Sequence, residues 1–204
     1  ETNKNIEMVI PILYSCYSGE KENIPIIKED LFILDKKNKN LIIKSLPGEK
    51  KPPILSIFRR FSSPVAWQSD LSLEDYLFLF LNDNDYFTRW DSGQILMREI
   101  IKSRIDNQEN YALEDSFIKA IKQSIKCLIV EDPFFLSTLL TLPGLTELES
   151  LFDKLDPINL SKESLNFKIS VGKGIQQNLI ILLDNIFKNI HHEWPIGRGE
   201  RKLL

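Results

Sequence analysis

The hydrophobic positions of this chain follow two different patterns, and the change falls near residue 70. Before it, apolar residues come in short runs rich in β-branched and aromatic side chains, broken by proline, glycine and polar residues, which is typical of β-strands. After it, apolar residues recur every three to four positions, as on one face of a helix. The pattern predicts a β module over residues 1–70, followed by a mainly α, layered helical array over residues 71–204.

Several segments of the first part are expected to be extended. In the longest, Pro11 favours an edge position or a bulge, because proline cannot donate a hydrogen bond to a neighbouring strand. The polar run 35–40 is expected to be a hairpin tip and not a binding patch, since no aromatic residue lies among its lysines. The expected extended segments are 6–17, 24–27, 31–34, 41–43, 54–58 and 65–67.

The helices of the second part carry clear start signals. Ser72 precedes an acidic first turn and is expected to be an N-cap, and Asp132 is expected to cap a helix that begins with proline. Gly172 and Gly174 are expected to mark a weak point in the last helix. No fixed sequence period is found, which argues against a strict repeat family. The expected helices are 73–81, 83–105, one that opens at Asn110 or Glu114 and runs to 128, and 133–140, 146–152 and 161–190.

Composition and charge narrow the class of protein. With 43% hydrophobic residues, 27% charged residues and a net charge of −3, the chain is expected to be a soluble globular protein that does not bind nucleic acid. Cys16 and Cys127 are too few for a disulfide framework and are expected to be buried free thiols. The apolar run 179–183 is too short for a membrane span. Because the chain does not begin with methionine, we expect it to be a piece of a longer polypeptide.

The two histidines are the first candidates for a metal site. His191, His192 and Glu193 resemble the start of His-Glu-x-x-His, in which two histidines one helical turn apart hold zinc. The second histidine is missing, because position 196 is isoleucine, and Pro195 would break the helix that the geometry requires. These residues are therefore expected to form a helix end and not a zinc site.

The other candidate residues are also expected to be structural. Ser62 and Ser63 precede a proline, and no histidine lies near them in sequence to act as a base. Gly172-Lys173-Gly174 lacks the spacing of a phosphate loop. The sequence therefore predicts no catalytic residue and no metal ligand, and it leaves the substrate-binding residues unknown. The residues expected on helix surfaces are the carboxylates Asp83, Asp85, Asp91, Glu147 and Glu149 and the basic residues Arg198, Arg201 and Lys202.

Two ordered motifs in the joining stretch carry a family resemblance. Residues 53–65, Pro-Ile-Leu-Ser-Ile-Phe-Arg-Arg-Phe-Ser-Ser-Pro-Val, resemble a pattern Pro-x-x-Ser-Leu-x-Arg-x-Phe-Ser-Ala-Pro-Val, with Ser63 in place of alanine. Residues 84–94, Asn-Asp-Tyr-Phe-Thr-Arg-Trp-Asp-Ser-Gly-Gln, resemble Asp-x-Phe-x-Arg-Trp-Asp-Ala-Gly-Gln. Both patterns belong to aminopeptidase N of the bacterial alanyl aminopeptidase type, in the gluzincin zinc metallopeptidase family. Residues 131–133, 140–143 and 152–158 are similar to later pieces of the same family.

The resemblance implies a place in a larger enzyme. In that family a β domain, a thermolysin-like catalytic domain, an immunoglobulin-like sandwich and a helical C-terminal domain follow one another. Residues 1–70 would be a partial immunoglobulin-like sandwich, and residues 71–204 would be the first part of the helical domain. The zinc ligands and catalytic groups of the family lie in its catalytic domain and have no matching position here. The resemblance thus implies zinc in the parent enzyme and none in this chain.

The resemblance also implies an architectural role. The sandwich would act as a spacer, and the helical array would cover the missing catalytic domain and restrict entry to peptide substrates, in a cytoplasmic enzyme that removes N-terminal amino acids. In the joining stretch, Phe58, Phe61, Val65 and Trp67 are expected to seal the end of the β module. Asp85 and Arg89 are expected to pair on a helix surface.

Two other functions remain open on the sequence. A non-enzymatic helical scaffold could hold a partner protein on its concave face. A soluble domain of unrelated function could share the motifs by chance. Since the sandwich lacks its first strands, an open β edge could also pair two copies into a dimer. Upstream sequence with His-Glu-x-x-His, and a glutamate about twenty residues later, would favour the enzyme.

Overall fold

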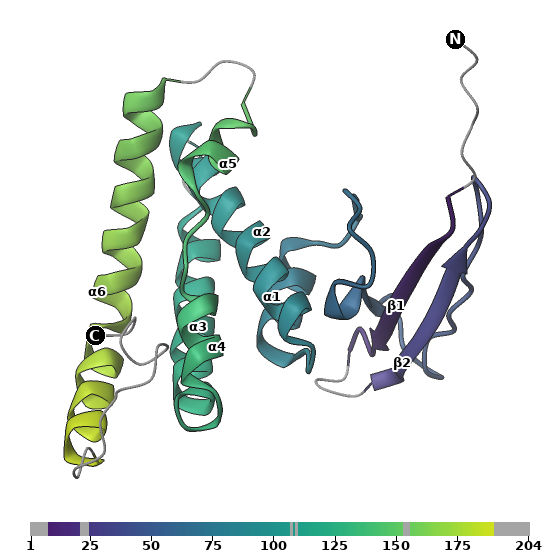
Figure 1. Cartoon of the computed structure of the whole chain (residues 1–204), viewed down its shortest axis with the longest axis horizontal. Helices are drawn as coiled ribbons and strands as arrows, with labels where there is room; N and C mark the ends of the chain where they lie inside the picture. The colour runs from purple at the N-terminus through teal and green to yellow at the C-terminus, as the bar shows by residue number, and fades with distance from the viewer. Residues whose placement is uncertain (1–7, 21–24, 107, 109, 153–155, 190–204) are drawn as a thin grey trace. The chain divides into compact units, whose positions relative to one another are not determined.

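The computed structural model describes residues 8–20, 25–106, 108, 110–152 and 156–189 (Figure 1). The chain divides into two compact units, residues 1–89 and residues 90–204. The first unit contains a sheet and the first helix, and the second contains most of the helical array. The predicted fold class, a β module followed by layered helices, is confirmed.

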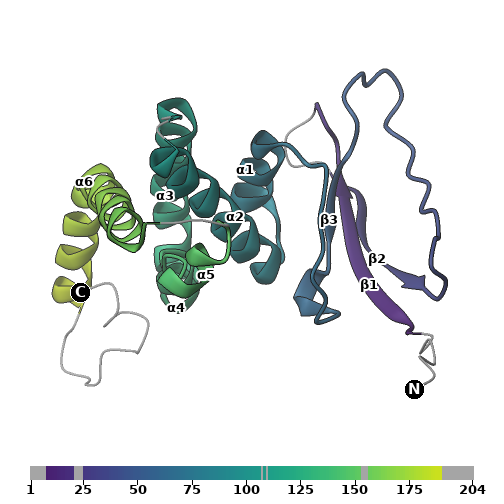
Figure 2. The same ribbon diagram turned by 90° about the horizontal axis from the view of Figure 1, so that it is seen from above.

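The sheet has three antiparallel strands in the order β2-β1-β3, with β1 in the centre (Figure 2). Strand β1 is Ile10–Tyr17, β2 is Pro25–Leu34 and β3 is Ile54–Ile57. The predicted first strand, 6–17, is confirmed over residues 10–17. Strand β3 pairs only with residues 14–17 of β1, so Pro11 lies where β1 has a single strand neighbour among the described residues.

Strand β2 differs from the prediction of two short extended segments. It is one strand of 10 residues that continues through the polar stretch Lys28-Glu29-Asp30. Its register against β1 shifts twice, between Tyr14 and Cys16 and between Cys16 and Tyr17. A bulge of this kind places an extra residue on one strand, so the polar stretch is accommodated without ending the strand.

Two segments predicted to be extended form no strand. Residues 41–43 do not return as the second arm of a hairpin, and residues 65–67 pair with no strand. In the first segment Ile42 is 84% exposed, so its apolar side chain finds no surface to cover. A short apolar run is therefore not enough to make a strand without a face to pack against.

Helix α1, Leu73–Asn82, begins as predicted at Ser72. The Ser72 hydroxyl accepts a hydrogen bond from the Asp75 amide at 3.1 Å, and the Asp75 carboxylate accepts one from the Ser72 amide at 2.9 Å. This capping box satisfies the amides that a helix start leaves unpaired. The helix packs against the sheet through the buried residues Tyr17, Ile54 and Leu79, with Leu71 and Phe78 beside them.

Helices α3 and α4 also begin at polar caps. Asn110 caps α3 by accepting from the Leu113 amide, and Asp132 caps α4 by accepting from the Phe135 amide at 2.8 Å. The predicted cap at Asp132 is confirmed, and Asn110, not Glu114, opens α3. The helix bounds are α2 Tyr86–Ile105, α3 Tyr111–Glu131, α4 Pro133–Leu139, α5 Leu145–Glu149 and α6 Pro157–Asn189.

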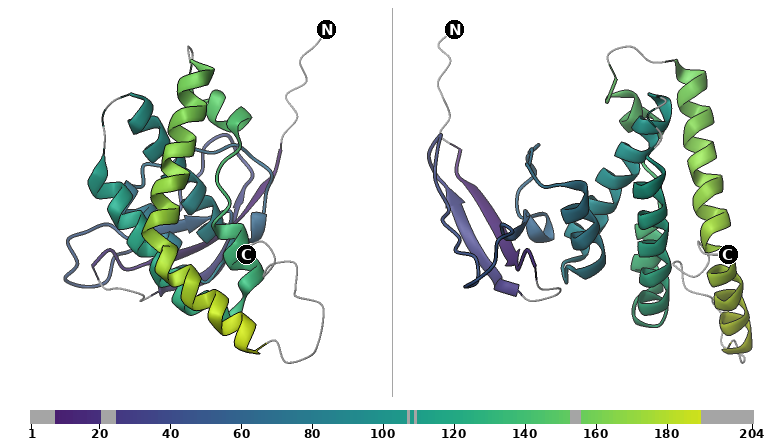
Figure 3. Two further views of the ribbon diagram at one scale, coloured as in Figure 1. Left: turned by 90° about the vertical axis from the view of Figure 1, so that its left-hand side faces the viewer. Right: turned by 180° about the vertical axis from the view of Figure 1, so that it is seen from behind.

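The long helix α6 lies along α3 (Figure 3). The rings of Phe117 and Phe167 stack across this contact with centroids 6.5 Å apart. A Cβ atom added to Gly174 would lie 2.6 Å from the Cγ2 atom of Ile118, so glycine permits the close approach of the two helices. Helix α6 continues through Gly172 and Gly174, so the predicted weak point does not interrupt it.

Candidate functional site

The joining stretch forms a buried polar cluster inside the first unit, with Arg59 at its centre. Arg59 is only 2% exposed and follows directly after β3. Its guanidinium donates to the Asp83 carboxylate at 2.6 Å and to the Glu29 carboxylate at 3.2 Å. It also donates to the Ser56 hydroxyl at 3.1 Å and to the side-chain oxygen of Asn84. One side chain thus joins β2, β3 and the connection between α1 and α2.

The charges around Arg59 keep it ionised. Burial by itself lowers the pKa of the guanidinium, but the charge and hydrogen bond of Asp83, helped by Glu29, outweigh burial and raise this pKa above its ordinary value. The second Asp83 oxygen, Oδ2, is buried and has no hydrogen-bond partner among the described residues. Removing Arg59 would therefore leave a buried carboxylate without its counter-charge.

Asp85 holds the start of α2. Its carboxylate accepts from the Thr88 amide at 2.9 Å and from the Thr88 hydroxyl at 3.0 Å, as an N-cap does. The same carboxylate accepts from the Arg60 amide at 3.1 Å. The Asp85 amide in turn donates to Asp83 at 2.7 Å. The acidic connection between the helices is thus used both to cap α2 and to bind the turn after β3.

The backbone of that turn is strained. Phe58, Arg60 and Phe61 have φ values of 56°, 53° and 55°, in the left-handed region that residues with a side chain rarely adopt. Each such residue costs on the order of 1–3 kcal/mol and persists only where the surroundings impose it. Here the Arg59 and Arg60 hydrogen bonds impose it, because they fix the turn on both of its sides.

The aromatic seal predicted for the β module is present only in part. Phe58 is buried, with its ring centroid 5.7 Å from that of Trp67, and Val65 and Trp67 are half-buried. Phe61 is 57% exposed, so its assignment to the seal was wrong. Its left-handed backbone turns the ring toward Phe87, with centroids 5.2 Å apart.

Ser62 and Ser63 bind the open side of β1. The Leu13 amide donates to the Ser62 hydroxyl at 3.1 Å, and the Ser63 hydroxyl donates to the Pro11 carbonyl at 2.6 Å. The two serines therefore satisfy strand groups beyond the end of β3. Both hydroxyls have structural partners, as the sequence predicted.

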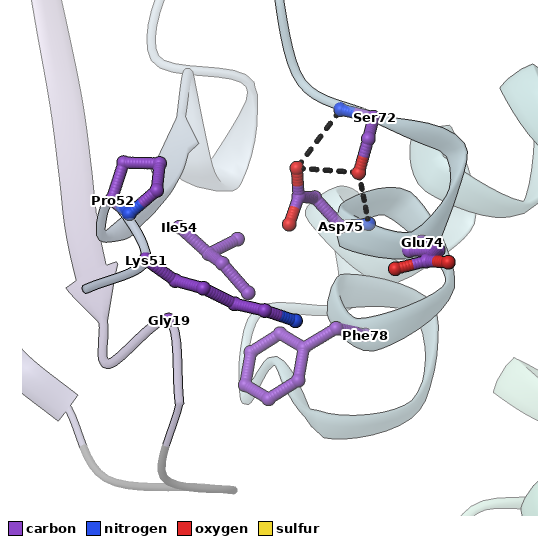
Figure 4. Close-up of a pocket in the computed structure, with 8 residues that line it drawn as sticks. All are labelled: Gly19, Lys51, Pro52, Ile54, Ser72, Glu74, Asp75 and Phe78. Atoms are coloured by element: carbon purple, nitrogen blue, oxygen red, sulfur yellow. Dashed lines mark hydrogen bonds between the residues drawn. The ribbon is translucent and has the colours of Figure 1, made fainter. Parts of the chain in front are cut away.

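The first unit also has a surface pocket between the sheet loops and α1, with a volume of about 360 Å³ (Figure 4). The side chain of Lys51 extends toward α1, where Glu74 and Phe78 also line the pocket (Figure 4). Gly19 and Pro52 line the pocket where two chain segments pack closely. A Cβ atom added to Gly19 would lie 2.2 Å from the Pro52 carbonyl oxygen. The Asp75 carboxylate at the pocket is already bound within the capping box.

The remaining carboxylate candidates differ in their surroundings. Asp83 and Asp85 were predicted on a helix surface, but both are buried, because they bind Arg59 and the α2 amides. The surface position predicted for Asp85 and Arg89 was also wrong, since Arg89 is buried as well and donates to the Phe80 carbonyl at 3.0 Å.

In the second unit, Asp91 and Glu147 are candidates of a different kind. Burial raises the pKa of Asp91, Arg98 counteracts the rise and Glu147 adds to it. Glu147 itself pairs with Arg98 on the surface. Glu149 is exposed at the end of α5.

The described residues do not fit a zinc site. In the described ranges, no three histidine, cysteine, aspartate or glutamate side chains are grouped so that they could hold a metal ion. Glu29 and Asp83 both bind the Arg59 guanidinium, which supplies the positive charge between them. The candidates His191, His192, Arg198, Arg201 and Lys202 lie outside the described residues.

Two further predictions can be compared with the structure. Cys16 is buried as predicted, but Cys127 is exposed, because it lies on the outer face of α3. Among the helices that the structure describes, none is both long enough and apolar enough to cross a membrane.

The sequence did not reveal a second buried ion pair, in the helical array. Glu114 is 6% exposed and accepts from Arg104 through both oxygens, at 3.0 and 2.8 Å. It also accepts from the Ser170 hydroxyl of α6. Glu114 lies in the first turn of α3, so its charge had suggested only a helix start. Nothing local in the sequence signals a partner 56 residues away.

Two domain families match this chain. The one described as a domain of unknown function (DUF3458) with an Ig-like fold matches residues 1–70. The one described as a domain of unknown function (DUF3458_C) with ARM repeats matches residues 73–204. The chain belongs to the family that these two domains define. The ARM description corrects the expectation against a repeat family: the helices vary from 5 to 33 residues, so unequal repeats leave no constant period.

The chain is similar to part of aminopeptidase N. It is 31% identical over 170 residues to aminopeptidase N of Caulobacter vibrioides, a match that covers 82% of this chain and 18% of that protein. It is 25% identical over 162 residues to aminopeptidase N of Escherichia coli, covering 75% of this chain and 18% of that protein. The chain thus spans less than a fifth of the length of these relatives, and the predicted resemblance is confirmed.

A solved structure has the same fold. The crystal structure of Legionella pneumophila aminopeptidase A in complex with aspartic acid matches with a TM-score of 0.78, over 97% of this chain and 23% of that chain. The sequences are 22% identical. At this identity the likeness shows the fold alone.

Proposed function

We propose that this chain is a non-catalytic, architectural region of a zinc metalloaminopeptidase that removes N-terminal amino acids from peptides. The observation that carries the proposal is the similarity to aminopeptidase N over 82% of the chain, in a part of the relatives that is 18% of their length. The zinc and the peptide substrate would be bound by a catalytic domain elsewhere in the same polypeptide. The β module, residues 1–70, would be a spacer, and the helical array, residues 71–204, would cover that domain.

The contacts of the joining stretch support a structural role. Arg59, Asp83 and Asp85 are charged groups of the joining stretch, and each is buried in hydrogen bonds to its own unit. A group used in this way cannot also bind substrate without leaving a buried charge unpaired, which is costly. The strained turn at Phe58 to Phe61 is accounted for by the same contacts.

The proposal is tested first on the chain by itself. The purified 204-residue chain is incubated with zinc, dialysed, and assayed for bound metal and for hydrolysis of an alanyl amide. We expect neither a stoichiometric zinc ion nor turnover. One zinc per chain, or zinc-dependent release of the amine, would overturn the proposal for this region.

A second test addresses the parent enzyme. The gene that encodes this chain is sequenced upstream of the codon for Glu1. The proposal expects His-Glu-x-x-His followed by a glutamate about twenty residues later, the ligand set of such zinc peptidases. An upstream sequence without that pattern would favour the alternative of a non-enzymatic helical scaffold. Cell fractionation of the parent would test the expected cytoplasmic location.

The role as a cover predicts a dependence on substrate size. In the longer polypeptide, Arg59→Met is expected to loosen the joining stretch while leaving the catalytic groups in place. Hydrolysis of a single alanyl amide should change little, and hydrolysis of larger peptides should rise. The neighbouring Arg60→Met is the matched control, because the Arg60 side chain is 69% exposed. An equal change for small and large substrates would contradict a cover.

A dimer through the open edge of the sheet is a further proposal. Among the described residues β2 has β1 as its one strand neighbour, so its outer edge could pair with a second copy. Its two register shifts and the charges at Lys28-Glu29-Asp30 oppose long regular pairing, so any such dimer should be weak. Sedimentation equilibrium of the wild type and of Ile26→Lys would detect it as a mass that falls in the variant.

A further inference from the structure

The surface pocket of the first unit lies between two fixed walls (Figure 4). One wall is the segment from Lys50 to Pro52. Its position is fixed because the Glu20 carboxylate accepts hydrogen bonds from the Lys50 and Lys51 amides, at 2.7 and 3.2 Å. The other wall is the start of α1, which the capping box holds in place. The pocket volume of about 360 Å³ lies in the range of small-molecule sites, about 300–1,000 Å³.

The two walls of the pocket carry opposite charges. The Lys51 side chain extends toward α1, and Glu74 lies in the first turn of that helix (Figure 4). Within the part of the chain that the structure describes, the Lys51 ammonium and the Glu74 carboxylate pair neither with each other nor with another side chain. A cation and an anion that line one cavity without pairing leave room for a molecule that pairs with both.

Two apolar side chains line the pocket between these charges. Ile54 is buried, and Phe78 is half-buried with its ring centroid 5.5 Å from that of Tyr17, in an edge-to-face contact. Both residues belong to the apolar contact between the sheet and α1, so their positions do not depend on a ligand. A molecule in the pocket would therefore meet a fixed apolar surface with a positive and a negative group beside it.

This combination of groups determines the chemistry of the ligand. A simple anion such as phosphate would be repelled by the carboxylates of Glu74 and Asp75, and a metal ion would be repelled by the Lys51 ammonium. The start of α1 offers no anion site in their place, because the Asp75 amide already donates to the Ser72 hydroxyl. A small zwitterion with an apolar group matches both charges and the apolar lining. Free α-amino acids have this composition.

We propose that this pocket binds a free α-amino acid with an apolar side chain, such as leucine. The ligand carboxylate pairs with Lys51, the ligand ammonium pairs with Glu74, and the ligand side chain contacts Ile54 and Phe78. Because both charged groups are near the surface, we expect a dissociation constant of about 1 mM. Binding is a property of this chain alone, so the proposal does not rest on the catalytic function of any parent protein.

The test compares leucine with three molecules that each lack one of its groups. Leucinamide lacks the carboxylate, 4-methylpentanoate lacks the ammonium, and glycine lacks the apolar side chain. Each is titrated into the 204-residue chain, and binding is measured from the NMR shifts of the Gly19, Ile54 and Phe78 amides. Leucine should saturate these shifts. Leucinamide and 4-methylpentanoate should bind about two- to fivefold more weakly, because each lacks one surface ion pair, and glycine at least about fivefold more weakly.

Single substitutions assign each ligand group to its partner. Lys51→Met should weaken leucine about two- to fivefold and should not weaken leucinamide, which has no carboxylate to lose contact with. Glu74→Gln should weaken leucine by a similar factor and should not weaken 4-methylpentanoate, which has no ammonium. Lys50→Met is the matched control, because Lys50 is the neighbouring exposed lysine and does not line the pocket. It should leave all four affinities unchanged.

Three outcomes would overturn the proposal. The first is the absence of saturable shifts at these amides with leucine up to about 50 mM. The second is equal binding of leucine, leucinamide and 4-methylpentanoate, which would mean that the charges take no part. The third is an equal loss of leucine affinity in Lys50→Met and Lys51→Met, which would assign the effect to general surface charge. Circular dichroism of each variant confirms that the fold is retained.

Discussion

The two units of this protein are stabilised in different ways. The first, residues 1–89, has a three-stranded sheet with a small apolar contact to α1, and a buried arginine joins its parts. The second, residues 90–204, has helices that bury apolar stripes against one another, and α3 and α4 begin at polar caps. A small sheet has too little apolar area to fix the turn after β3, so charged hydrogen bonds fix it instead.

The difference changes what a single substitution does. In the first unit the connections depend on a few charged groups, so removing one partner leaves another buried and unpaired. In the second unit the contacts are many and apolar, and the largest local sensitivity is the close approach of α3 and α6 at Gly174. The following predictions test this difference, from the largest expected effect to the smallest.

Removing the central arginine should have the largest effect. Arg59→Met leaves the buried Asp83 carboxylate without its counter-charge, and we expect a loss of about 3–5 kcal/mol in the free energy of unfolding of the first unit. Urea unfolding is followed by tryptophan fluorescence in a chain with Trp90→Phe and Trp194→Phe, so that Trp67 reports on this unit alone. Arg60→Met should cost no more than about 1 kcal/mol, because its ion pair with Glu29 is exposed.

Filling the close contact between α3 and α6 should have an intermediate effect. Gly174→Ala places a methyl group 2.6 Å from Ile118, and we expect a loss of about 1–3 kcal/mol in the second unit. Gly172→Ala, two residues away in open space, should stabilise the same helix by about 0.5–1 kcal/mol. Thermal unfolding followed by circular dichroism compares the pair. Two changes of the same sign would show that α6 does not lie as close to α3 as described.

Neutralising Asp91 should have a smaller effect that depends on pH. Burial raises the pKa of Asp91 in the folded state, so its contribution to stability is present at low pH and is lost as the pH rises through that pKa. Asp91→Asn should therefore raise the melting temperature at pH 7. The gain should shrink as the pH falls toward the ordinary range of a carboxylate, where the wild-type side chain is also neutral. A gain that is constant from pH 4 to pH 8 would contradict this explanation.

The thiols of Cys16 and Cys127 should be alkylated at different rates, and this difference involves no change in the stability of the protein. Burial raises the pKa of Cys16 to about 11, whereas Cys127 is exposed on α3. At pH 8 iodoacetamide should modify one thiol per native chain quickly and the other only after unfolding, because the thiolate is the reactive form. Mass spectrometry of Cys127→Ser should show no fast modification. Fast labelling of Cys16 in that variant would mean that the sheet opens readily.

Local signals in the sequence were enough to predict the caps and the broad architecture. Ser72 and Asp132 act within three residues of their own position, so the pattern around them contains all the needed information. The same holds for the helical stripes, whose period belongs to the helix itself. The mistakes fell on segments such as 41–43, whose structure depends on whether another surface covers them.

The polar cluster could not be predicted because its partners are distant in sequence. Arg59 binds Glu29, 30 residues earlier, and Asp83, 24 residues later. Glu29 lies in the bulged part of β2, where the sequence predicted a gap between two short extended segments. The sequence predicted a structural role for this stretch, but only the folded contacts show which partners bind its charges.

The most direct test of this account is a double-mutant cycle on Arg59 and Asp83, with Trp67 fluorescence as the probe of urea unfolding. Asp83→Asn removes the charge and keeps an oxygen for the Asp85 amide. We expect each single variant to be strongly destabilised and the double variant to lose much less than their sum, with a coupling energy of about 2–3 kcal/mol. Additive effects, within about 0.5 kcal/mol, would contradict the claim that this buried pair holds the joining stretch together.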